Sequence, residues 1–188
     1  FIKKIMKKFS IIKNINGVKL VKYFNSKDTR GNFSKIFTSD FFYSHGFKKK
    51  ISQVNISTNI KKGTVRGFHY QKKPRNEQKI VICNKGSILD VVIDLRKKSK
   101  YYLKTYKFLL SENKNNCLFI PAGFAHGFQS LKNNTQIIYF HSELYYEKLD
   151  TGINPLHNKF DFTWPIKVTE ISKRDRSLPI INNSFKGI

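Results

Sequence analysis

The segment RGFHYQ, residues 66–71, places an imidazole and a guanidinium close together in the chain. His69 can take up or release a proton near neutral pH, which makes it a candidate for acid–base chemistry. A regular strand would send Arg66 and His69 to opposite faces, because their positions differ by three. If both side chains serve one cavity, Gly67 or Phe68 must lie in a β-bulge or a strong twist. On its own, His69 would be interpreted more simply as a hydrogen-bonded residue of a strand.

An RNA-binding strand is a second interpretation of the same segment. Arg66, Gly67 and Phe68 match the start of a signature in which a small residue precedes the next aromatic. His69 occupies the small position and puts an imidazole where a flat stacking surface is needed. The mismatch disfavours RNA binding and leaves His69 to be explained.

Pro121, Gly123 and His126 lie in the segment FIPAGFAHGF, residues 119–128. Their spacing is similar to the second motif of the cupins, Pro-x-Gly-x-x-His. Cupins have a double-stranded β-helix or jelly-roll fold, and the motif predicts a strand, a turn and a second strand here.

Many cupins bind a transition metal through a His-x-His pair, a glutamate and the histidine of this second motif. Here the first pair would be His69 and Gln71, so one ligand is missing. Glu77 could replace it only by pointing inward beside Lys79, which would give a site of two histidines and a carboxylate. We expect no metal and no other cofactor, and we keep a metal-dependent cupin enzyme as the alternative.

Three further residues could join this chemistry. Tyr139 lies thirteen residues after His126, and Lys79 lies ten after His69, so strands of a barrel could bring them to one lumen. Alone, the tyrosine could be a core residue with a hydrated hydroxyl, and the lysine could be solvated. Asp175 lies between two arginines, where a surface ion pair of little energetic value is the simpler interpretation.

The segments that must position these groups follow a period of two rather than 3.6. In SILDVVIDLR, residues 87–96, one face of a strand is wholly apolar. The run KIVIC, residues 79–83, precedes it across the turn NKGS, which predicts a β-hairpin. Further strands are expected at residues 103–110, 116–121 and 135–144, and short helical turns at residues 39–44 and 172–176.

Many short strands and few helices predict an all-β sandwich or barrel. The 188 residues contain no repeat, linker or low-complexity segment, so we predict a single domain over residues 1–188. Within it, residues 1–16 are expected to form a basic leader and residues 180–188 a C-terminal tail.

The formal net charge of +24 would favour anionic partners such as nucleic acid, a membrane surface or small anionic ligands. The lysines are spread along the whole chain beside many Asn and Ile residues, which fits compositional drift better than nucleic-acid binding. Cys83 and Cys117 lie in separate apolar runs and are expected to be buried, reduced thiols. Lysines interrupt every apolar stretch near the N-terminus, so we predict no secretory signal, no membrane span and a cytoplasmic location.

Together these segments resemble the dTDP-4-dehydrorhamnose 3,5-epimerase family in order and spacing. The matching segments, within residues 17–179, are DTRGNF, GTVRGFHYQ, EQKIV, SILDVVIDLR, LFIPAGFAHGF, IIYF and ISKRD. The resemblance implies a metal-independent cupin jelly roll, usually a homodimer, that acts on a nucleotide-diphospho-4-keto-6-deoxy sugar. The implied reaction removes a proton beside the C4 ketone to give an enolate and returns a proton from the opposite face, at C3, C5 or both.

The resemblance also implies roles for single residues. His69 would be the base and Asp175 its partner, Lys79 would stabilise the C4 oxyanion, and Tyr139 would be the acid on the other side. The positions that match substrate-binding residues are Arg30, Gln53, Asn55, Arg66, His126 and Tyr145.

The sequence departs from the family pattern near the expected nucleotide site. Asn32 stands where an aromatic is usual, Lys35 where a glutamate is usual, and Leu144 precedes Tyr145 in place of a Tyr-Tyr pair. The catalytic core is intact, so we expect the same reaction type and leave the nucleotide and the sugar open. A basic module that binds nucleic acid or an acidic surface without catalysis is the third hypothesis.

Overall fold

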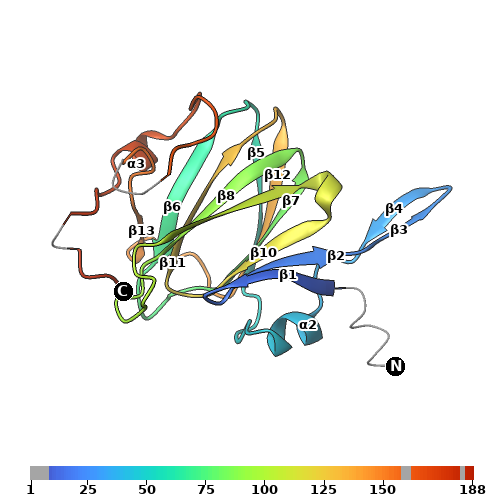
Figure 1. Cartoon of the computed structure of the whole chain (residues 1–188), viewed down its shortest axis with the longest axis horizontal. Helices are drawn as coiled ribbons and strands as arrows, with labels where there is room; N and C mark the ends of the chain where they lie inside the picture. The colour runs from blue at the N-terminus through green and yellow to red at the C-terminus, as the bar shows by residue number, and fades with distance from the viewer. Residues whose placement is uncertain (1–8, 158–161, 183–184) are drawn as a thin grey trace.

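Two antiparallel β-sheets face each other across a shared apolar core (Figure 1). This computed structural model describes residues 9–157, 162–182 and 185–188. The six-stranded sheet has the order β1 (Phe9–Ile15), β2 (Val18–Tyr23), β10 (Asn116–Ile120), β7 (Lys79–Lys85), β12 (Thr135–His141) and β5 (Gln53–Asn59). The five-stranded sheet has the order β13 (Asp150–Gly152), β6 (Val65–Gln71), β11 (Phe124–Ser130), β8 (Ser87–Asp94) and β9 (Thr105–Ser111).

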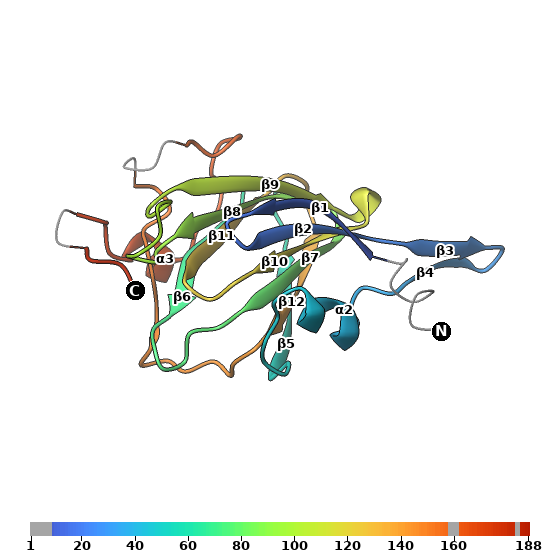
Figure 2. The same cartoon turned by 60° about the horizontal axis from the view of Figure 1, so that its bottom comes forward.

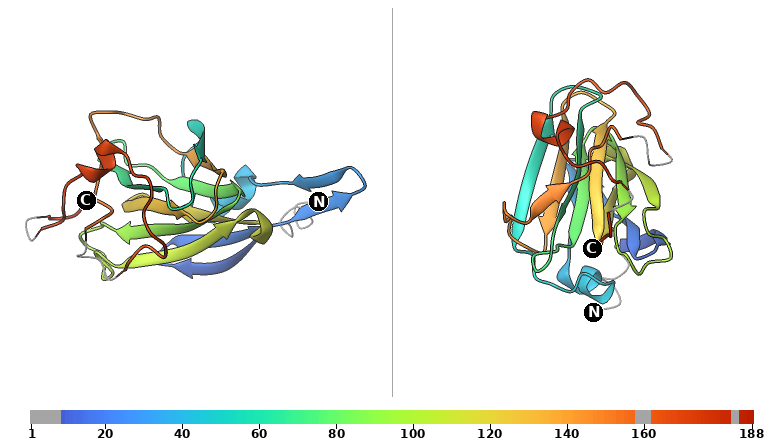
Figure 3. Two further views of the ribbon diagram at one scale, coloured as in Figure 1. Left: turned by 90° about the horizontal axis from the view of Figure 1, so that it is seen from above. Right: turned by 90° about the vertical axis from the view of Figure 1, so that its left-hand side faces the viewer.

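The remaining elements are short. A hairpin of β3 (Asn25–Asp28) and β4 (Gly31–Ser34) projects from the sandwich, and α2 (Ser39–Ser44) covers part of the six-stranded sheet (Figure 2). A 3₁₀ turn, η1 (Glu112–Lys114), connects β9 to β10, and α3 (Lys173–Arg176) lies beside β6 (Figure 3). The all-β class and both short helices are therefore as predicted.

Alternate residues of the central strands enter two different apolar layers. On β7, Val81 faces the core between the sheets, whereas Ile80 and Ile82 pack outward against the phenylalanines of α2. On β8, Val92 faces the same inner core, whereas Ile93 lies in an outer layer with Phe68. Burial on both faces explains why these strands are apolar over nearly their whole length.

The predicted hairpin of residues 79–94 is wrong. β7 pairs with β10 and β12, whereas β8 pairs with β9 and β11 in the other sheet. Between them, Gly86 has a φ of +82°, and a Cβ there would lie 2.5 Å from the hydroxyl oxygen of Thr135. The sequence correctly predicted a turn between β7 and β8. This turn carries the chain from one sheet to the other, and the local sequence does not specify that change of sheet.

Both expected tails contribute to the packing. Within the expected leader, residues 9–15 form β1, which pairs with β2. At the other end, Ile181, Phe185 and Ile188 pack on the outer layer of the five-stranded sheet. Among the described residues, no helix is long and apolar enough to cross a membrane. Cys83 and Cys117 are buried free thiols, as predicted.

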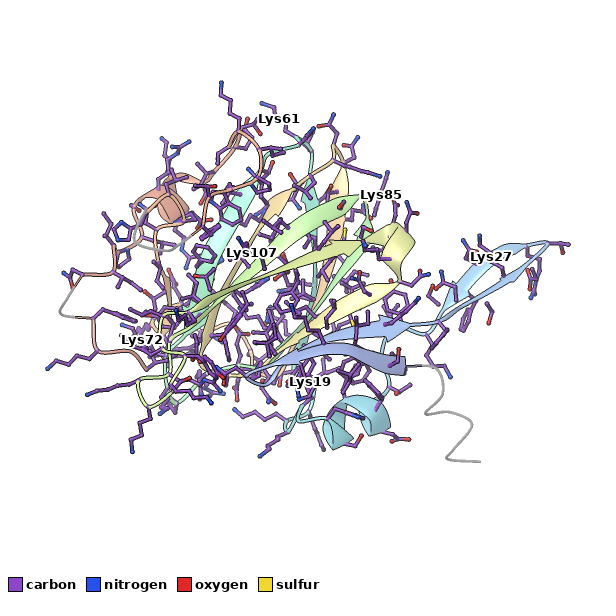
Figure 4. The ribbon with its side chains drawn as sticks, in the orientation of Figure 1. Lys19, Lys27, Lys61, Lys72, Lys85 and Lys107 are labelled. Carbon is purple, nitrogen blue, oxygen red and sulfur yellow. The ribbon has the colours of Figure 1, made fainter. Side chains whose placement is uncertain are left out.

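The excess positive charge is spread over the molecule. The lysines labelled in Figure 4 project from separate strands and loops on several sides: Lys19, Lys27, Lys61, Lys72, Lys85 and Lys107. Such a distribution fits compositional drift better than a single basic face built for nucleic acid.

Candidate active site

A cavity of about 530 Å³ opens between the two sheets. It is lined by the inward faces of strands from both sheets, beside the apolar core. Lys79 shares its face of β7 with Val81, and Tyr139 shares its face of β12 with Ile137, because alternate residues of a strand point the same way. The polar lining residues are Asn55, Ser57, Arg66, His69, Lys79, His126, Tyr139 and His141.

A β-bulge brings Arg66 and His69 to this one cavity. His126 of β11 pairs with His69, but Phe128 pairs with Arg66, so β6 has an extra residue between the two pairs. Gly67 has a φ of +115°, and a Cβ there would lie 2.5 Å from the Cα of Gly127. The bulge predicted from the spacing is therefore confirmed.

His69 is bound to a buried carboxylate. Its Nε2 lies 2.7 Å from Oδ1 of Asp175, whose other oxygen accepts a hydrogen bond from the Gly67 N–H at 3.1 Å. Ser172 caps α3 by accepting from the Asp175 N–H, which fixes the aspartate at the start of the helix. Burial would raise the pKa of Asp175, but the hydrogen bond and charge of His69 outweigh it and hold that pKa below its usual value. The surface ion pair considered for Asp175 is therefore wrong.

Tyr139 extends from β12 into the cavity. Its ring contacts His126 edge-on at a centroid distance of 6.3 Å and stacks on His141 at 5.8 Å. Burial, followed by the negative charge of Asp90, raises the pKa of the Tyr139 hydroxyl. The phenol is therefore protonated at neutral pH and can donate a proton.

His126 also has a carboxylate partner. Its Nε2 lies 2.9 Å from Oδ2 of Asp90, and both side chains are almost completely buried. In the pairing of β11 with β8, His126 lies opposite Val92 and Phe128 lies opposite Asp90. His126 and Asp90 therefore interact diagonally across two neighbouring strands of one sheet. His126 thus lines the cavity with little freedom to reorient.

Lys79 does not stand alone in the cavity. Its Nζ lies 2.8 Å from Oε1 of Glu77, and Oε2 of Glu77 lies 2.7 Å from Nδ1 of His141. Sequence reasoning considered Glu77 only as a metal ligand and missed His141. The available signal was the period of two, which puts Glu77 on the face of Lys79, and His141 on the face of Tyr139.

The remaining predicted binding residues form a smaller cavity of about 160 Å³ next to the first. Gln53, Asn55 and Tyr145 line it, and the Tyr145 N–H donates to Oε1 of Gln53 at 2.9 Å. Arg66 is held in the main cavity by Asn59, whose Oδ1 accepts from Nε of Arg66 at 2.8 Å.

The structure does not bring Arg30 to either cavity. This residue lies at the turn of the projecting β3–β4 hairpin (Figure 1), highly exposed and paired with Asp28 at 2.6 Å. Asn32 lies on the same exposed hairpin, and Lys35 follows it. The prediction that Arg30 binds substrate thus has no support within one chain.

The groups considered for a metal make hydrogen bonds or ion pairs with other groups of the protein. Among the described residues, no three histidine, cysteine or acidic side chains are arranged to hold a metal ion. Glu77 points to Lys79 and His141, whereas Gln71 is buried and donates to the Leu144 carbonyl at 3.2 Å.

Comparison with known proteins identifies the family. The family model for dTDP-4-dehydrorhamnose 3,5-epimerase matches residues 13–183. The chain belongs to this family. The epimerase of Sinorhizobium fredii is 35% identical over 167 residues, which cover 88% of this chain and 86% of the relative.

Solved structures of this epimerase family share the fold. The Bacillus anthracis enzyme, with TDP and PPi bound, gives a TM-score of 0.87 at 31% identity and covers 92% of this chain and 99% of its own. The Legionella pneumophila enzyme, in complex with dTDP-4-keto-L-rhamnose, gives a TM-score of 0.86 at 27% identity and covers 92% of each chain. The cupin-type β fold and the classification as an isomerase are therefore confirmed.

Proposed function

We propose that this protein inverts C3, C5 or both centres of a dTDP-4-keto-6-deoxyhexose. The observation that carries the proposal is the cavity in which His69, Tyr139 and Lys79 meet. The dTDP sugar bound by the Legionella pneumophila relative and the TDP bound by the Bacillus anthracis relative support this class of substrate.

His69 is the base in this proposal. Its Nε2 is bound to Asp175, which leaves the lone pair of Nδ1 free to take the proton from the carbon next to the ketone. The ionised Asp175 stabilises the imidazolium that forms. Catalysis by a positioned base of this kind contributes about 10²–10⁴-fold.

Lys79 stabilises the enolate oxygen at C4. Loss of the carbon-bound proton moves an electron pair onto the ketone oxygen, and an ammonium aimed at that oxygen stabilises the developing charge. Its side chain is only 11% exposed, so water screens the interaction weakly.

Tyr139 returns a proton to the opposite face of the same carbon. The phenol loses its proton to the enolate carbon, the C4 ketone re-forms, and the configuration is inverted. Solvent then reprotonates the phenolate and takes the proton from His69, so the enzyme is restored. The raised pKa of Tyr139 keeps the phenol protonated before each turnover.

Arg66 and His126 line the same cavity and serve substrate binding in this proposal, with Gln53, Asn55 and Tyr145 beside them. A guanidinium can donate two parallel hydrogen bonds to phosphate oxygens, which suits Arg66 to the diphosphate.

Arg30 needs a homodimer to take part. The β3–β4 hairpin projects away from the body of its own chain, so its turn can meet a cavity only in a second copy (Figure 1). Light scattering should give twice the chain mass, and Arg30→Ala should raise KM without lowering kcat. A wild-type protein with the mass of one chain, together with an unchanged KM in Arg30→Ala, would contradict both points.

A cytoplasmic location remains a prediction.

The decisive experiment is incubation with dTDP-4-keto-6-deoxyglucose in D₂O, followed by NMR. Deuterium incorporation with inversion at both C3 and C5 indicates a double epimerase. Incorporation with inversion at only one of these carbons indicates a single-centre epimerase. His69→Ala should abolish exchange at both carbons, whereas Tyr139→Phe should retain some exchange but lose inversion. Absence of exchange in folded protein, over several nucleotides, would contradict the proposal. Activity lost to chelator and restored by iron, zinc or manganese would favour the metal-dependent alternative.

A further inference from the structure

A third imidazole–carboxylate pair, besides His69–Asp175 and His126–Asp90, lies where the two cavities adjoin. Glu77 bridges two groups: Oε2 lies 2.7 Å from Nδ1 of His141, and Oε1 lies 2.8 Å from Nζ of Lys79. The three side chains are 9–13% exposed, so the bridge is largely shielded from water.

Local structure fixes the direction of the bridge. Gln78 points away from the cavity, because its Oε1 accepts from the Lys48 N–H at 2.7 Å and its Nε2 donates to the Gly46 carbonyl at 2.8 Å. Glu77 and Lys79, one position to either side, both line the adjoining smaller cavity. His141 is the cross-strand partner of Lys79 in the pairing of β12 with β7, so all three groups meet.

The charges match this arrangement. Burial would raise the pKa of Glu77, but the Lys79 ammonium and the His141 ring outweigh it and lower that pKa to about 2. Glu77 is thus ionised at neutral pH. The other acidic groups nearby are occupied: Asp175 binds His69, Asp150 binds Arg174, and Glu143 binds Lys49 and Arg75. Among the described residues, Glu77 is the carboxylate that Lys79 contacts.

We propose that Glu77, held by His141, is a positioning residue that fixes the Lys79 ammonium at the ketone side of the cavity. The proposal rests on the oxyanion role of Lys79 given above. A lysine has a flexible four-carbon stem, and its ammonium acts as a point charge without preferred direction. The carboxylate restricts that freedom and supplies the counter-charge, and the His141 ring, stacked on Tyr139, holds the carboxylate in turn.

The test compares Glu77→Gln with wild type on the dTDP-4-keto sugar. We expect kcat to fall about tenfold or more, below the roughly 10²–10³-fold loss of an oxyanion donor itself, with KM within about twofold. Glu112→Gln is the matched control, because removing this partly exposed carboxylate on η1 changes the net charge equally and Glu112 lies outside both cavities.

The pH profile supplies a readout that a purely structural role would not change. Without its counter-charge, a partly buried ammonium is less favoured, so the alkaline limb of kcat should move to lower pH in Glu77→Gln. Wild type and Glu112→Gln should share one profile. The other titratable or charged groups that line the adjoining cavity are His69, Glu143, Tyr145, Asp150 and Arg174.

A double-mutant cycle separates positioning from general damage. If Glu77 acts through Lys79, adding Glu77→Gln to Lys79→Met should cause no further loss of activity. If the fold-losses of activity caused by Glu77→Gln and Lys79→Met multiply in the double variant, the two residues act independently and the proposal is overturned. His141→Phe keeps a ring beside Tyr139 but cannot bind the carboxylate, so it should lower kcat as Glu77→Gln does, and His141→Gln should restore part of the rate.

The outcomes distinguish this proposal from the proposed function. If wild type epimerises the sugar and Glu77→Gln matches Glu112→Gln in kcat and pH profile, the positioning role is wrong and the epimerase remains. If wild type inverts no 4-keto sugar, the proposed function is wrong. If Glu77→Gln does not fold, His141→Phe decides, and its wild-type kcat would overturn the proposal.

Discussion

The three histidines of the cavity differ in accessibility and in the nitrogen that binds a carboxylate. His69 and His126 use Nε2, whereas His141 uses Nδ1. The side chain of His69 is 28% exposed and that of His126 only 6%, so His69 is the one of these two that can reach a substrate carbon without rearrangement. Residue type alone would not have separated them, because each ring has a buried acidic partner.

Asp175→Asn should therefore impair chemistry more than binding. The amide cannot stabilise an imidazolium, and its NH₂ group favours the wrong tautomer of His69, so we expect kcat to fall about a hundredfold or more. KM should change little, because Asp175 lies behind the ring rather than in the cavity. Steady-state kinetics measure this, with Asp40→Asn, at an exposed position on α2 outside both cavities, as control for the loss of a charge. Equal kcat in the two variants would contradict the role of Asp175.

Acid stability should report the Glu77 bridge. The pKa of Glu77 is about 2 in the folded state and near 4.5 in the unfolded chain, so its contribution to stability is present above pH 4.5 and is lost as pH falls toward 2. Wild type should lose more unfolding free energy across this window than Glu77→Gln. Urea titrations at several pH values measure the difference. Parallel curves for the two proteins would show that the bridge is not formed in solution.

At the scale of elements, the sequence predicted features that depend on local spacing. The period of two located β7, β8, β9, β10 and β12, and the cupin motif located β11. The three-residue separation of Arg66 and His69 required the bulge that β6 contains. Strand partners were not predictable in the same way. β7 and β8 are both buried on two faces, so their sequences do not indicate to which sheet each strand belongs. The prediction that they pair as a hairpin was therefore wrong. The Glu77–His141 contact joins residues 64 positions apart and needed that pairing to be known.

The bulge predicts an effect of substitution at Gly67. Alanine there would combine a φ of +115° with a Cβ 2.5 Å from the Cα of Gly127, so we expect a loss of more than about 2 kcal/mol of unfolding free energy. Gly31→Ala is a matched control, because its φ is +128° but no atom lies within 4 Å of the added Cβ. Its loss should be about 1 kcal/mol. Equal losses in chemical denaturation would mean that close packing of β6 on β11 does not require glycine.

At the scale of the whole molecule, the two sheets together form both the apolar core and the cavity. Apolar residues of both inner faces form the central core, and polar residues of the same faces line the cavity beside it. Five strands contribute the functional side chains, so the site exists only when both sheets are assembled: β5, β6, β7, β11 and β12. The sequence could indicate the candidates and their likeness to a family, but the cavity itself is a product of tertiary packing.

The net charge of +24 acts on the molecule as a whole and should affect substrate capture rather than the chemical step. A nucleotide-diphospho sugar is anionic, so a positive surface potential raises its local concentration, and salt screens that attraction over a Debye length of about 10 Å at 0.1 M. Raising sodium chloride from about 0.03 to 0.3 M should therefore increase KM several-fold and leave kcat within about twofold, because the cavity groups lie closer to the substrate than that length. Initial rates over a matrix of salt and substrate concentrations measure both constants. If kcat falls with salt while KM is constant, the surface charge does not guide the substrate, and the ion pairs inside the cavity are the salt-sensitive groups.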